Sequence, residues 1–365
     1  MTLKYIAAAV ALATAGVAVV LTQQRPAVSA TLTAVEGIRV GHYTLSERPT
    51  GCTVILIDGQ GAVGGIAQRG PAPGTRETDV LDPLNMVEHV NAIVLSGGSA
   101  YGLDAAQGVM RYLEERKVGY PIAGGVVPIV PAAVIFDLPF GGRPDVRPTA
   151  DCGYRAATAA VGTPVQEGNF GVGAGATVGK IGGLIGRGGG TPGRLAMKAG
   201  VGSAAIRFDN GLVVAAMAVA NALGDVIDPA TGRVVAGVRN ADGSLADARR
   251  LLRSGITTNA RAGENTTLVV VATNAQLTKA QATRMALVAD DGLARAINPA
   301  HTQADGDTVF TLATGRWTGT VDLTTLGALA AEVTADAIVR AATQATTSGG
   351  LASARETGSI PDRFK

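Results

Sequence analysis

The chain has 365 residues, of which 47% are hydrophobic, 16% are charged and 4% are aromatic, and its formal net charge is +2 at pH 7. A chain of this length can bury a large core, as one big domain or two ordinary ones, and the scarcity of aromatic residues means that Ala, Val, Leu and Ile have to fill it. The small net charge, without a long block of Lys or Arg, excludes the electrostatic footprint of a nucleic-acid-binding protein, so we expect no nucleic-acid partner.

Residues 1–30 are predicted to be a secretory signal. Lys4 is the only charge before an apolar run over residues 6–21, and small residues precede a cleavage site after Ala30. The alternative is an uncleaved membrane anchor, although the run is slightly short for a comfortable span. Either way we expect export, to the cell envelope, the periplasm or the medium.

Cys52 and Cys152 are the two cysteines of the chain. Export permits a disulfide, but the sequence alone does not show that the two residues are close enough to bond. We expect two small buried thiols, because a fold of this size does not need a covalent cross-link. Pairing of the two cysteines is the open alternative.

The N-terminal half is predicted to contain short strands and two helices. Apolar residues at helical spacing predict a helix over 101–116, and Asp151 is expected to N-cap an Ala-rich helix that ends near Gly162. The Pro- and Gly-rich residues 71–74 predict a loop. Strands are predicted at 38–43, 53–58, 62–67 and 91–95 and within 126–136.

The C-terminal half is predicted to begin with a glycine-rich loop or a pair of loosely specified strands over 168–194. Residues 224–262 are polar and are expected at the surface, and the tail after Ser348 is expected to be mobile. Strands are predicted at 201–207, 212–220, 267–272 and 308–312, and helices near 245–254, from a Thr278 cap to 297, and over 323–345. These elements indicate α/β layers without the regular rhythm of a doubly wound sheet.

Histidine and glycine motifs do not supply an obvious site. His42, His89 and His301 are the only histidines, so a three-histidine zinc site would use all of them, and we expect no metal and no cofactor. Residues 175–180 lack the pattern of a phosphate-binding loop. The turn at 97–101 lacks the last glycine of a nucleophile elbow.

A polar segment, Gly263 to Thr267, leads directly into a strongly apolar strand. A plain turn before a strand is the simplest interpretation. If the bond between Asn265 and Thr266 breaks, however, Thr266 carries both a hydroxyl and a free α-amine, whose ordinary pKa is about 7.7 to 8.0. That amine can act as general base for its own hydroxyl, so no histidine is required.

Several segments in the same order resemble the DmpA-type aminopeptidases, which include L-aminopeptidase/D-esterases and β-peptidyl aminopeptidases. The pattern is most similar to the branch of nylon-oligomer (6-aminohexanoate-oligomer) endohydrolases. The resemblance extends from about Val35 to Val339. It is carried by residues 73–78 (PGTRET), 95–103 (LSGGSAYGL), 134–137 (VIFD), 263–267 (GENTT) and 301–308 (HTQADGDT).

The resemblance implies a single large domain with the four-layer αββα sandwich of the N-terminal-nucleophile type. It implies self-cleavage between Asn265 and Thr266 into chains 31–265 and 266–365, which stay associated, and a homo-oligomer, with a tetramer as the favoured form. The implied activity is hydrolysis of amide bonds in small peptides, aminoacyl amides or ω-amino acid oligomers.

The resemblance also assigns roles to residues. Thr266 corresponds to the nucleophile, and Asp305 and Asp307 correspond to an acidic pair that orients it, although the two could simply flank a turn at Gly306. Asn221 corresponds to the amide that donates to the oxyanion, an effect worth about 3 kcal/mol in other enzymes.

The active-site lysine is assigned to Lys180, although Lys198 lies near a lysine of the aminopeptidase branch. In the substrate pocket, Phe136 replaces a tyrosine of the nylon-oligomer branch, so any hydrogen bond that the phenol makes to substrate is absent. The substrate of that branch therefore cannot be assigned to this chain. Two other functions stay open: a catalytically inactive envelope protein of the same fold, and a serine hydrolase that uses Ser99 and His301.

Overall fold

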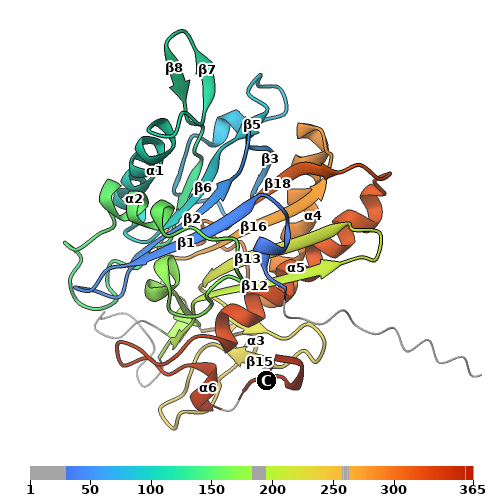
Figure 1. Ribbon diagram of the computed structural model, residues 1–365. Coiled ribbons are helices and arrows are strands. Elements are labelled where there is room, and N and C mark those ends of the chain that lie inside the picture. The colour runs from blue at the N-terminus through green and yellow to red at the C-terminus, as the bar shows by residue number, and fades with distance from the viewer. Residues whose placement is uncertain are drawn as a thin grey trace, which may run out of the picture.

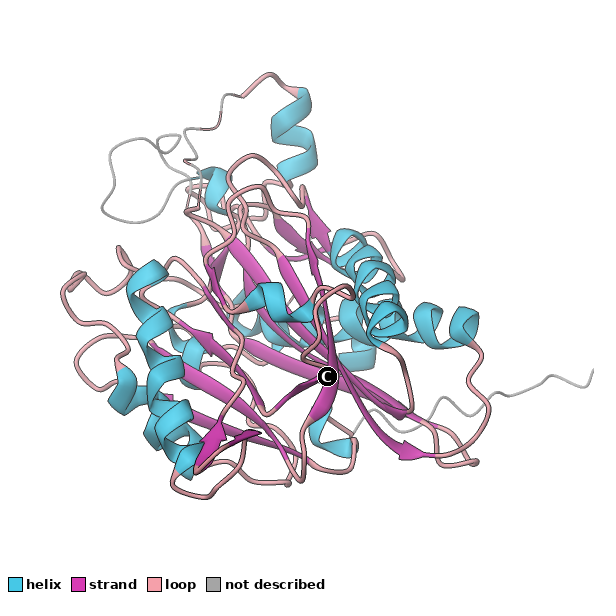
Figure 2. Ribbon diagram, turned by 90° about the horizontal axis from the view of Figure 1, so that it is seen from above, coloured by secondary structure: helices cyan, strands magenta, loops and turns pink. Residues whose placement is uncertain are grey.

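Two β-sheets stack face to face, and helices cover the outer face of each sheet (Figure 1). The computed structural model describes residues 30–182, 195–256, 258, 261, 263–357 and 359–364. Viewed from above, the strands lie between two groups of helices (Figure 2). The predicted αββα sandwich is confirmed, whereas the predicted signal segment, apart from Ala30, lies outside the described residues.

The first sheet has five strands in the order β1-β2-β6-β9-β4, and only β6 and β9 run parallel. Its strands are β1 (Ile38–Thr44), β2 (Gly51–Ile57), β4 (Thr75–Arg76), β6 (Ala92–Ser96) and β9 (Ala132–Val134). Helices α1 (Ala105–Glu114) and α2 (Ala150–Thr158) cover its outer face. Thr149 is the N-cap residue of α2, so Asp151 lies in the first turn and pairs with Arg155 instead of capping the helix as expected.

The second sheet has six strands in the order β12-β13-β16-β18-β3-β5. Its strands are β3 (Ala62–Gln68), β5 (His89–Val90), β12 (Val201–Arg207), β13 (Val213–Asn221), β16 (Thr266–Ala275) and β18 (Thr308–Trp317). Helices α4 (Lys279–Ala296) and α5 (Leu323–Thr343) cover its outer face. Strands β16 and β18 are parallel neighbours at the centre of this sheet.

Three apolar clusters hold the four layers together. One lies between the two sheets, and the other two lie between each sheet and its helices. Small residues allow the layers to approach closely: a Cβ atom on Gly202 of β12 would lie 2.2 Å from the Ala337 carbonyl oxygen of α5. The glycine-rich, aromatic-poor composition therefore suits closely stacked layers.

The segment after β13 is more structured than predicted. Strands β14 (Asp225–Ile227) and β15 (Val234–Ala236) of this segment form a small sheet with β17 (Ile297–Asn298), which comes after α4 in the chain, and α3 (Ala248–Arg253) follows β15. The Asp225 carboxylate is buried and accepts hydrogen bonds from the backbone N–H groups of Val238 and Ala248. The expectation of a polar surface excursion is therefore wrong for this part of the segment.

The C-terminal tail packs against the body of the protein. Leu351 and Phe364 are buried, and Arg363 forms ion pairs of 2.6 Å with Asp228 and 2.7 Å with Asp336. Helix α6 (Ala354–Thr357) lies within this tail. The expectation of a mobile tail is wrong, because apolar burial and ion pairs fix it.

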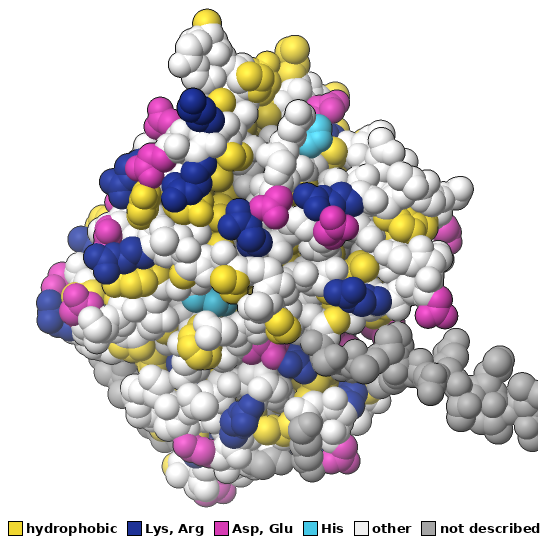
Figure 3. Space-filling view, in the orientation of Figure 1, with side chains coloured by type: hydrophobic (Ala, Val, Ile, Leu, Met, Phe, Trp, Pro, Cys, Tyr) yellow, Lys and Arg dark blue, Asp and Glu magenta, His cyan; other side chains and the backbone are white. Residues whose placement is uncertain are grey.

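Two short antiparallel pairs complete the strands: β7 (Tyr120–Ile122) with β8 (Gly125–Val127), and β10 (Thr177–Val178) with β11 (Met197–Lys198). On the face shown in Figure 3, basic and acidic side chains are interspersed. Within the described ranges, the helices are too short or too polar to cross a membrane.

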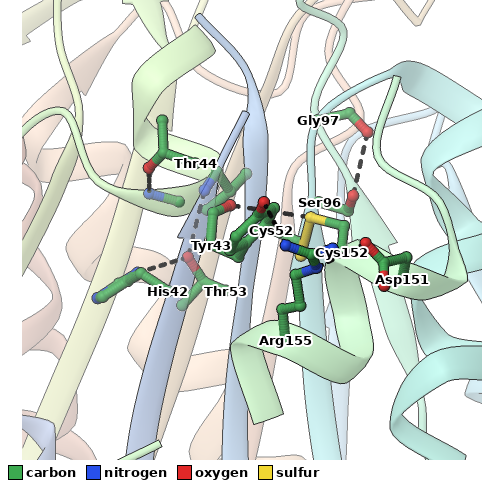
Figure 4. The surroundings of a disulfide bond; sticks show 12 residues. His42, Tyr43, Thr44, Cys52, Thr53, Ser96, Gly97, Asp151, Cys152 and Arg155 are labelled. Carbon is green, nitrogen blue, oxygen red and sulfur yellow. Dashed lines mark hydrogen bonds and ion pairs between the residues drawn. A yellow bond between two sulfur atoms is a disulfide. The ribbon is translucent and has the colours of Figure 1, made fainter. Parts of the chain in front are cut away.

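Cys52 of β2 and Cys152 of α2 form a disulfide, with their Cα atoms 6.2 Å apart (Figure 4). The expectation of two free thiols is wrong. The bond joins the first sheet to the helix on its outer face. The two cysteines are 100 residues apart in the sequence, and this separation gives no sign that they lie close together in the fold. Both cysteines precede Asn265, so this bond would not link chains 31–265 and 266–365 if the predicted self-cleavage occurs.

We expect reduction of this disulfide, or the double change Cys52→Ala and Cys152→Ala, to lower stability. Closing a loop of this size stabilises a protein by up to about 4.7 kcal/mol through the entropy of the unfolded chain. Thermal unfolding with and without a reductant measures the effect. Unchanged unfolding, or an intact mass that shows two free thiols, would contradict the bond.

Candidate active site

Thr266 is the first residue of β16 and lies between two strands that supply polar groups to it. Asn221, the last residue of β13, is its register partner on one side, and β18 runs alongside on the other. The exposed fractions of Asn265 and Thr266 are 2% and 3%. The Asn265–Thr266 bond is therefore buried, at the point where an irregular segment enters the sheet.

The carbonyl oxygen of Asn265 accepts two hydrogen bonds. One comes from the side-chain hydroxyl of Thr266, and the other from the backbone N–H of Gly306, at 2.8 Å. A Cβ atom on Gly306 would lie 2.9 Å from the Thr266 hydroxyl oxygen and 2.5 Å from the carbonyl oxygen of Ala72. Glycine at this position thus lets a backbone donor approach the carbonyl without displacing the threonine.

Asp307 binds the strand directly after the threonine. Its Oδ1 atom accepts the backbone N–H of Thr267 at 2.7 Å, and its Oδ2 atom accepts the backbone N–H of His301 at 3.1 Å. The side chain is almost fully buried. Asp307 thus contacts Thr267 and not Thr266 itself, and its orienting role stays a prediction.

Asp305 has a different set of contacts. Its Oδ2 atom accepts hydrogen bonds from the backbone N–H and the hydroxyl of Thr302, so its carboxylate closes a turn, while its backbone pairs with Asn265. Burial, and next the nearby charge of Asp307, raise the pKa of Asp305. Both the turn and the site interpretation of this residue are consistent with these contacts.

His301 lies between two buried carboxylates. Its Nδ1 atom is 3.0 Å from Asp307 Oδ2, and its Nε2 atom is 3.2 Å from Asp290 Oδ2 on α4. Burial alone would lower the pKa of His301, but the close carboxylates of Asp290 and Asp307 outweigh it and raise the pKa to about 10. Both ring nitrogens are engaged in this way, which argues against His301 as a general base for Ser99.

Lys180 and Asn221 form the opposite side of the site. The Lys180 Nζ atom is 2.9 Å from the backbone oxygen of Asn221, 2.8 Å from its Oδ1 atom and 3.4 Å from the Glu264 carbonyl oxygen. The Thr177 N–H also donates to Asn221 Oδ1, at 3.2 Å, so two donors fix the orientation of the amide. Burial lowers the pKa of Lys180 to about 7, although nearby carboxylates, first among them Asp305, oppose it.

Lys198 has a separate environment. Its Nζ atom donates to the carbonyl oxygens of Gly173, Ala176 and Ala199. Burial lowers its pKa to about 7 as well. These contacts hold the glycine-rich turn that precedes Thr177, so Lys180 is the lysine that lies beside the Asn265–Thr266 bond.

Phe136 borders the site through its backbone, since its carbonyl oxygen lies 3.4 Å from Asn221 Nδ2. The next residue, Asp137, forms a fully buried ion pair of 2.9 Å with Arg48 and accepts the Thr50 hydroxyl at 2.6 Å. A buried pair with its remaining hydrogen bonds satisfied keeps this segment in one conformation.

A family model described as "Peptidase family S58" matches residues 30–355. The chain belongs to peptidase family S58. It is a hydrolase that acts on peptide or linear amide bonds, and the resemblance in its sequence motifs is confirmed.

The relatives of the S58 chain include proteins named as aminopeptidases and as oligomer endohydrolases. The chain is 46% identical over 298 residues to an uncharacterized aminopeptidase of Mycobacterium tuberculosis, covering 78% of this chain and 81% of that protein. It is 30% identical over 327 residues to a 6-aminohexanoate-oligomer endohydrolase of a Kocuria species, covering 84% of each chain.

A solved structure supports the fold. The L-aminopeptidase D-Ala-esterase/amidase of Ochrobactrum anthropi, described as a variant of the Ntn hydrolase fold, has a TM-score of 0.63 with 19% identity, over 91% of this chain and 95% of that one. At this identity the likeness shows the fold alone. The αββα layers of the S58 chain are therefore those of an Ntn-hydrolase-like protein.

Sequence reasoning missed three groups of this site. The Gly306 N–H was missed because backbone donors carry no residue-type signal. His301 and Asp290 were missed as a pair because they lie on separate elements, although an acidic residue on the largely apolar buried face of a helix is an available sign. Arg69, which pairs with Asp290 at 3.1 Å, is half-exposed, and nothing in the sequence around it indicates this contact.

We expect Lys198→Met to destabilise the S58 chain. The change removes the Lys198 donor from the carbonyl oxygens of Gly173, Ala176 and Ala199, of which Gly173 and Ala176 each keep a backbone N–H donor, at a cost of about 1–3 kcal/mol in the free energy of unfolding. Thermal or denaturant unfolding measures this loss, and Lys180→Met provides the comparison. A Lys198→Met protein with wild-type stability would show that these contacts are not structural.

Proposed function

We propose that this S58-family chain is an autoprocessed N-terminal-nucleophile amide hydrolase that cuts its own Asn265–Thr266 bond and then uses Thr266 as the nucleophile. One observation carries the proposal: the Thr266 hydroxyl is hydrogen-bonded to the carbonyl that it would attack. The Gly306 N–H, bound to the same oxygen, supports the proposal as a donor for the negative charge that develops there.

The self-cleavage reaction follows from these contacts. The Thr266 oxygen attacks the Asn265 carbonyl carbon, and the resulting oxyanion keeps its hydrogen bond from Gly306. The carbon–nitrogen bond then breaks, and the Thr266 nitrogen leaves as an amine after it takes up a proton. The ester that remains is hydrolysed by water, which gives an Asn265 carboxylate and frees the Thr266 hydroxyl, so that Thr266 then carries both a hydroxyl and an α-amine.

Lys180 is the proposed proton acceptor for this first reaction. Before the cut, Thr266 has no free α-amine, so another base is required. The Lys180 Nζ atom contacts the backbone oxygen of Asn221, which is the register partner of Thr266, and the backbone oxygen of Glu264, which precedes Asn265. With a pKa of about 7, a substantial fraction of this amine is neutral at neutral pH.

Turnover uses the groups that the cut releases. The Thr266 α-amine takes the proton of its own hydroxyl, the hydroxyl oxygen attacks a substrate amide, and the Asn221 amide donates to the oxyanion. An acyl ester on Thr266 forms as the amine product leaves, and water releases the acid. Small peptides, aminoacyl amides and ω-amino acid oligomers are the proposed substrates, supported by the names of the similar aminopeptidases and endohydrolase.

Export and assembly are further parts of the proposal. The Cys52–Cys152 disulfide supports an oxidising location outside the cytoplasm. The homo-oligomer implied by the resemblance stays a prediction.

The purified wild-type protein is expected to contain a chain that starts at Thr266, whereas Thr266→Val is expected to stay intact. Valine keeps the shape but removes the attacking oxygen. Thr311→Val is the matched control, because it removes a buried hydroxyl that lacks a hydrogen-bond partner on the neighbouring strand β18. Intact-mass spectrometry compares the three proteins. An intact wild type would favour an inactive member of the family, and a cleaved Thr266→Val would place the nucleophile elsewhere.

Self-cleavage is expected to depend on pH through Lys180. Precursor kept at pH 5 and then transferred to higher pH should cleave about tenfold faster per pH unit until about pH 7 and then level off, because the neutral amine becomes the dominant form. Mass spectrometry over time gives the rate. A rate that stays constant between pH 5.5 and 8.5, or normal cleavage in Lys180→Met, would exclude Lys180 as the base.

A further inference from the structure

A chain of alternating charges extends from the surface to the strand that carries Thr266. Arg69, whose side chain is 47% exposed, pairs with Asp290 of α4 at 3.1 Å. Asp290 faces one ring nitrogen of His301, Asp307 faces the other, and Asp307 accepts the N–H of Thr267. Four side chains from different parts of the fold thus connect helix α4 to the residue after the proposed nucleophile.

The backbone of His301 is shaped for this contact. Its φ angle is +53°, a left-handed conformation that a residue other than glycine adopts at a cost. In this conformation both the backbone N–H and ring Nδ1 of His301 lie close to the same atom, Asp307 Oδ2, at 3.1 and 3.0 Å. One residue therefore holds one carboxylate oxygen by two contacts.

We propose that His301 is a positioning residue that, as an imidazolium cation held between Asp290 and Asp307, fixes the Asp307 carboxylate and through it the strand end that carries Thr266. The inference rests on the proposed function, because it gives His301 a role in self-cleavage and turnover. His301 itself does not touch the Asn265–Thr266 bond in the contacts described above.

The positive charge of His301 is central to this role. Asp290, Asp305 and Asp307 are all buried. Negative charges at such short separations repel each other strongly in a poorly solvated site. The cations that face this acidic group are His301, Lys180 from the opposite side and Arg69 from the surface. Without the imidazolium, Asp290 and Asp307 would lose the cation that they share, and Asp307 would be held less firmly on the Thr267 N–H.

The charge of His301 can be measured directly by NMR. The chain has three histidines, so single substitutions assign their ring signals. We expect His301 to stay protonated past pH 8 and to titrate near pH 10, while Asp290→Asn shifts that titration to lower pH. The stability that the cation contributes is then complete below about pH 6.5 and is lost as the pH rises through about 10. A His301 signal that titrates near pH 6.5 in the wild type would overturn the proposal.

The effect on the reaction is tested with two variants and one control. His301→Asn removes the cation but tolerates the left-handed backbone, and Asp290→Asn removes the carboxylate that faces Nε2. We expect self-cleavage about 10- to 100-fold slower in His301→Asn, from a displaced nucleophile, and a smaller loss in Asp290→Asn. His42→Asn is the control, because the His42 ring contacts the Thr53 hydroxyl on the other sheet, and it should cleave at the wild-type rate.

The outcomes separate this inference from the proposed function. A wild-type chain that stays uncut contradicts the proposed function, while the NMR titration still tests the cation between the two aspartates. A wild-type chain that is cut, together with a folded His301→Asn that is cut at the same rate and pH profile, contradicts the positioning role alone. If His301→Asn does not fold, Asp290→Asn decides by the same comparison.

Discussion

The carbonyl oxygen of Asn265 is the point around which the site is organised. It accepts hydrogen bonds from the Thr266 hydroxyl and from the Gly306 N–H, so the proposed attacking group and a proposed stabilising donor converge on one peptide bond. This convergence requires β16 to begin inside the protein, between β13 and β18. The stacked sheets supply that environment, because their shared apolar cluster buries the strand that Thr266 begins.

Burial also determines the electrostatics of the site. Charged groups that leave water are costly unless they are paired: burial alone lowers the pKa of a cation, whereas carboxylates beside it raise the pKa. His301 is paired on both sides and its pKa rises to about 10, whereas Lys180 contacts mainly neutral oxygens and its pKa falls to about 7. The same low-dielectric interior thus holds one cation charged and makes the other available as a base.

Much of this arrangement could be predicted from the sequence, because strands and helices have periodic patterns and the 263–267 and 301–308 segments resemble a known family. The missing parts depend on distant contacts. The Cys52–Cys152 bond, the packed tail and the small sheet around Asp225 arise from elements that meet only in the folded chain. The Asp290–His301 contact is of the same kind, since a helix residue and a loop residue give separate and weak signals.

The most direct measurement of the central claim is the site at which a small, amide-reactive acylating probe labels the mature enzyme. Peptide mapping by mass spectrometry after brief labelling gives that site. The account predicts one ester adduct, on Thr266 as the first residue of the smaller chain, and none in Thr266→Val. Labelling at Ser99, or the same labelling in the wild type and in Thr266→Val, would contradict Thr266 as the nucleophile.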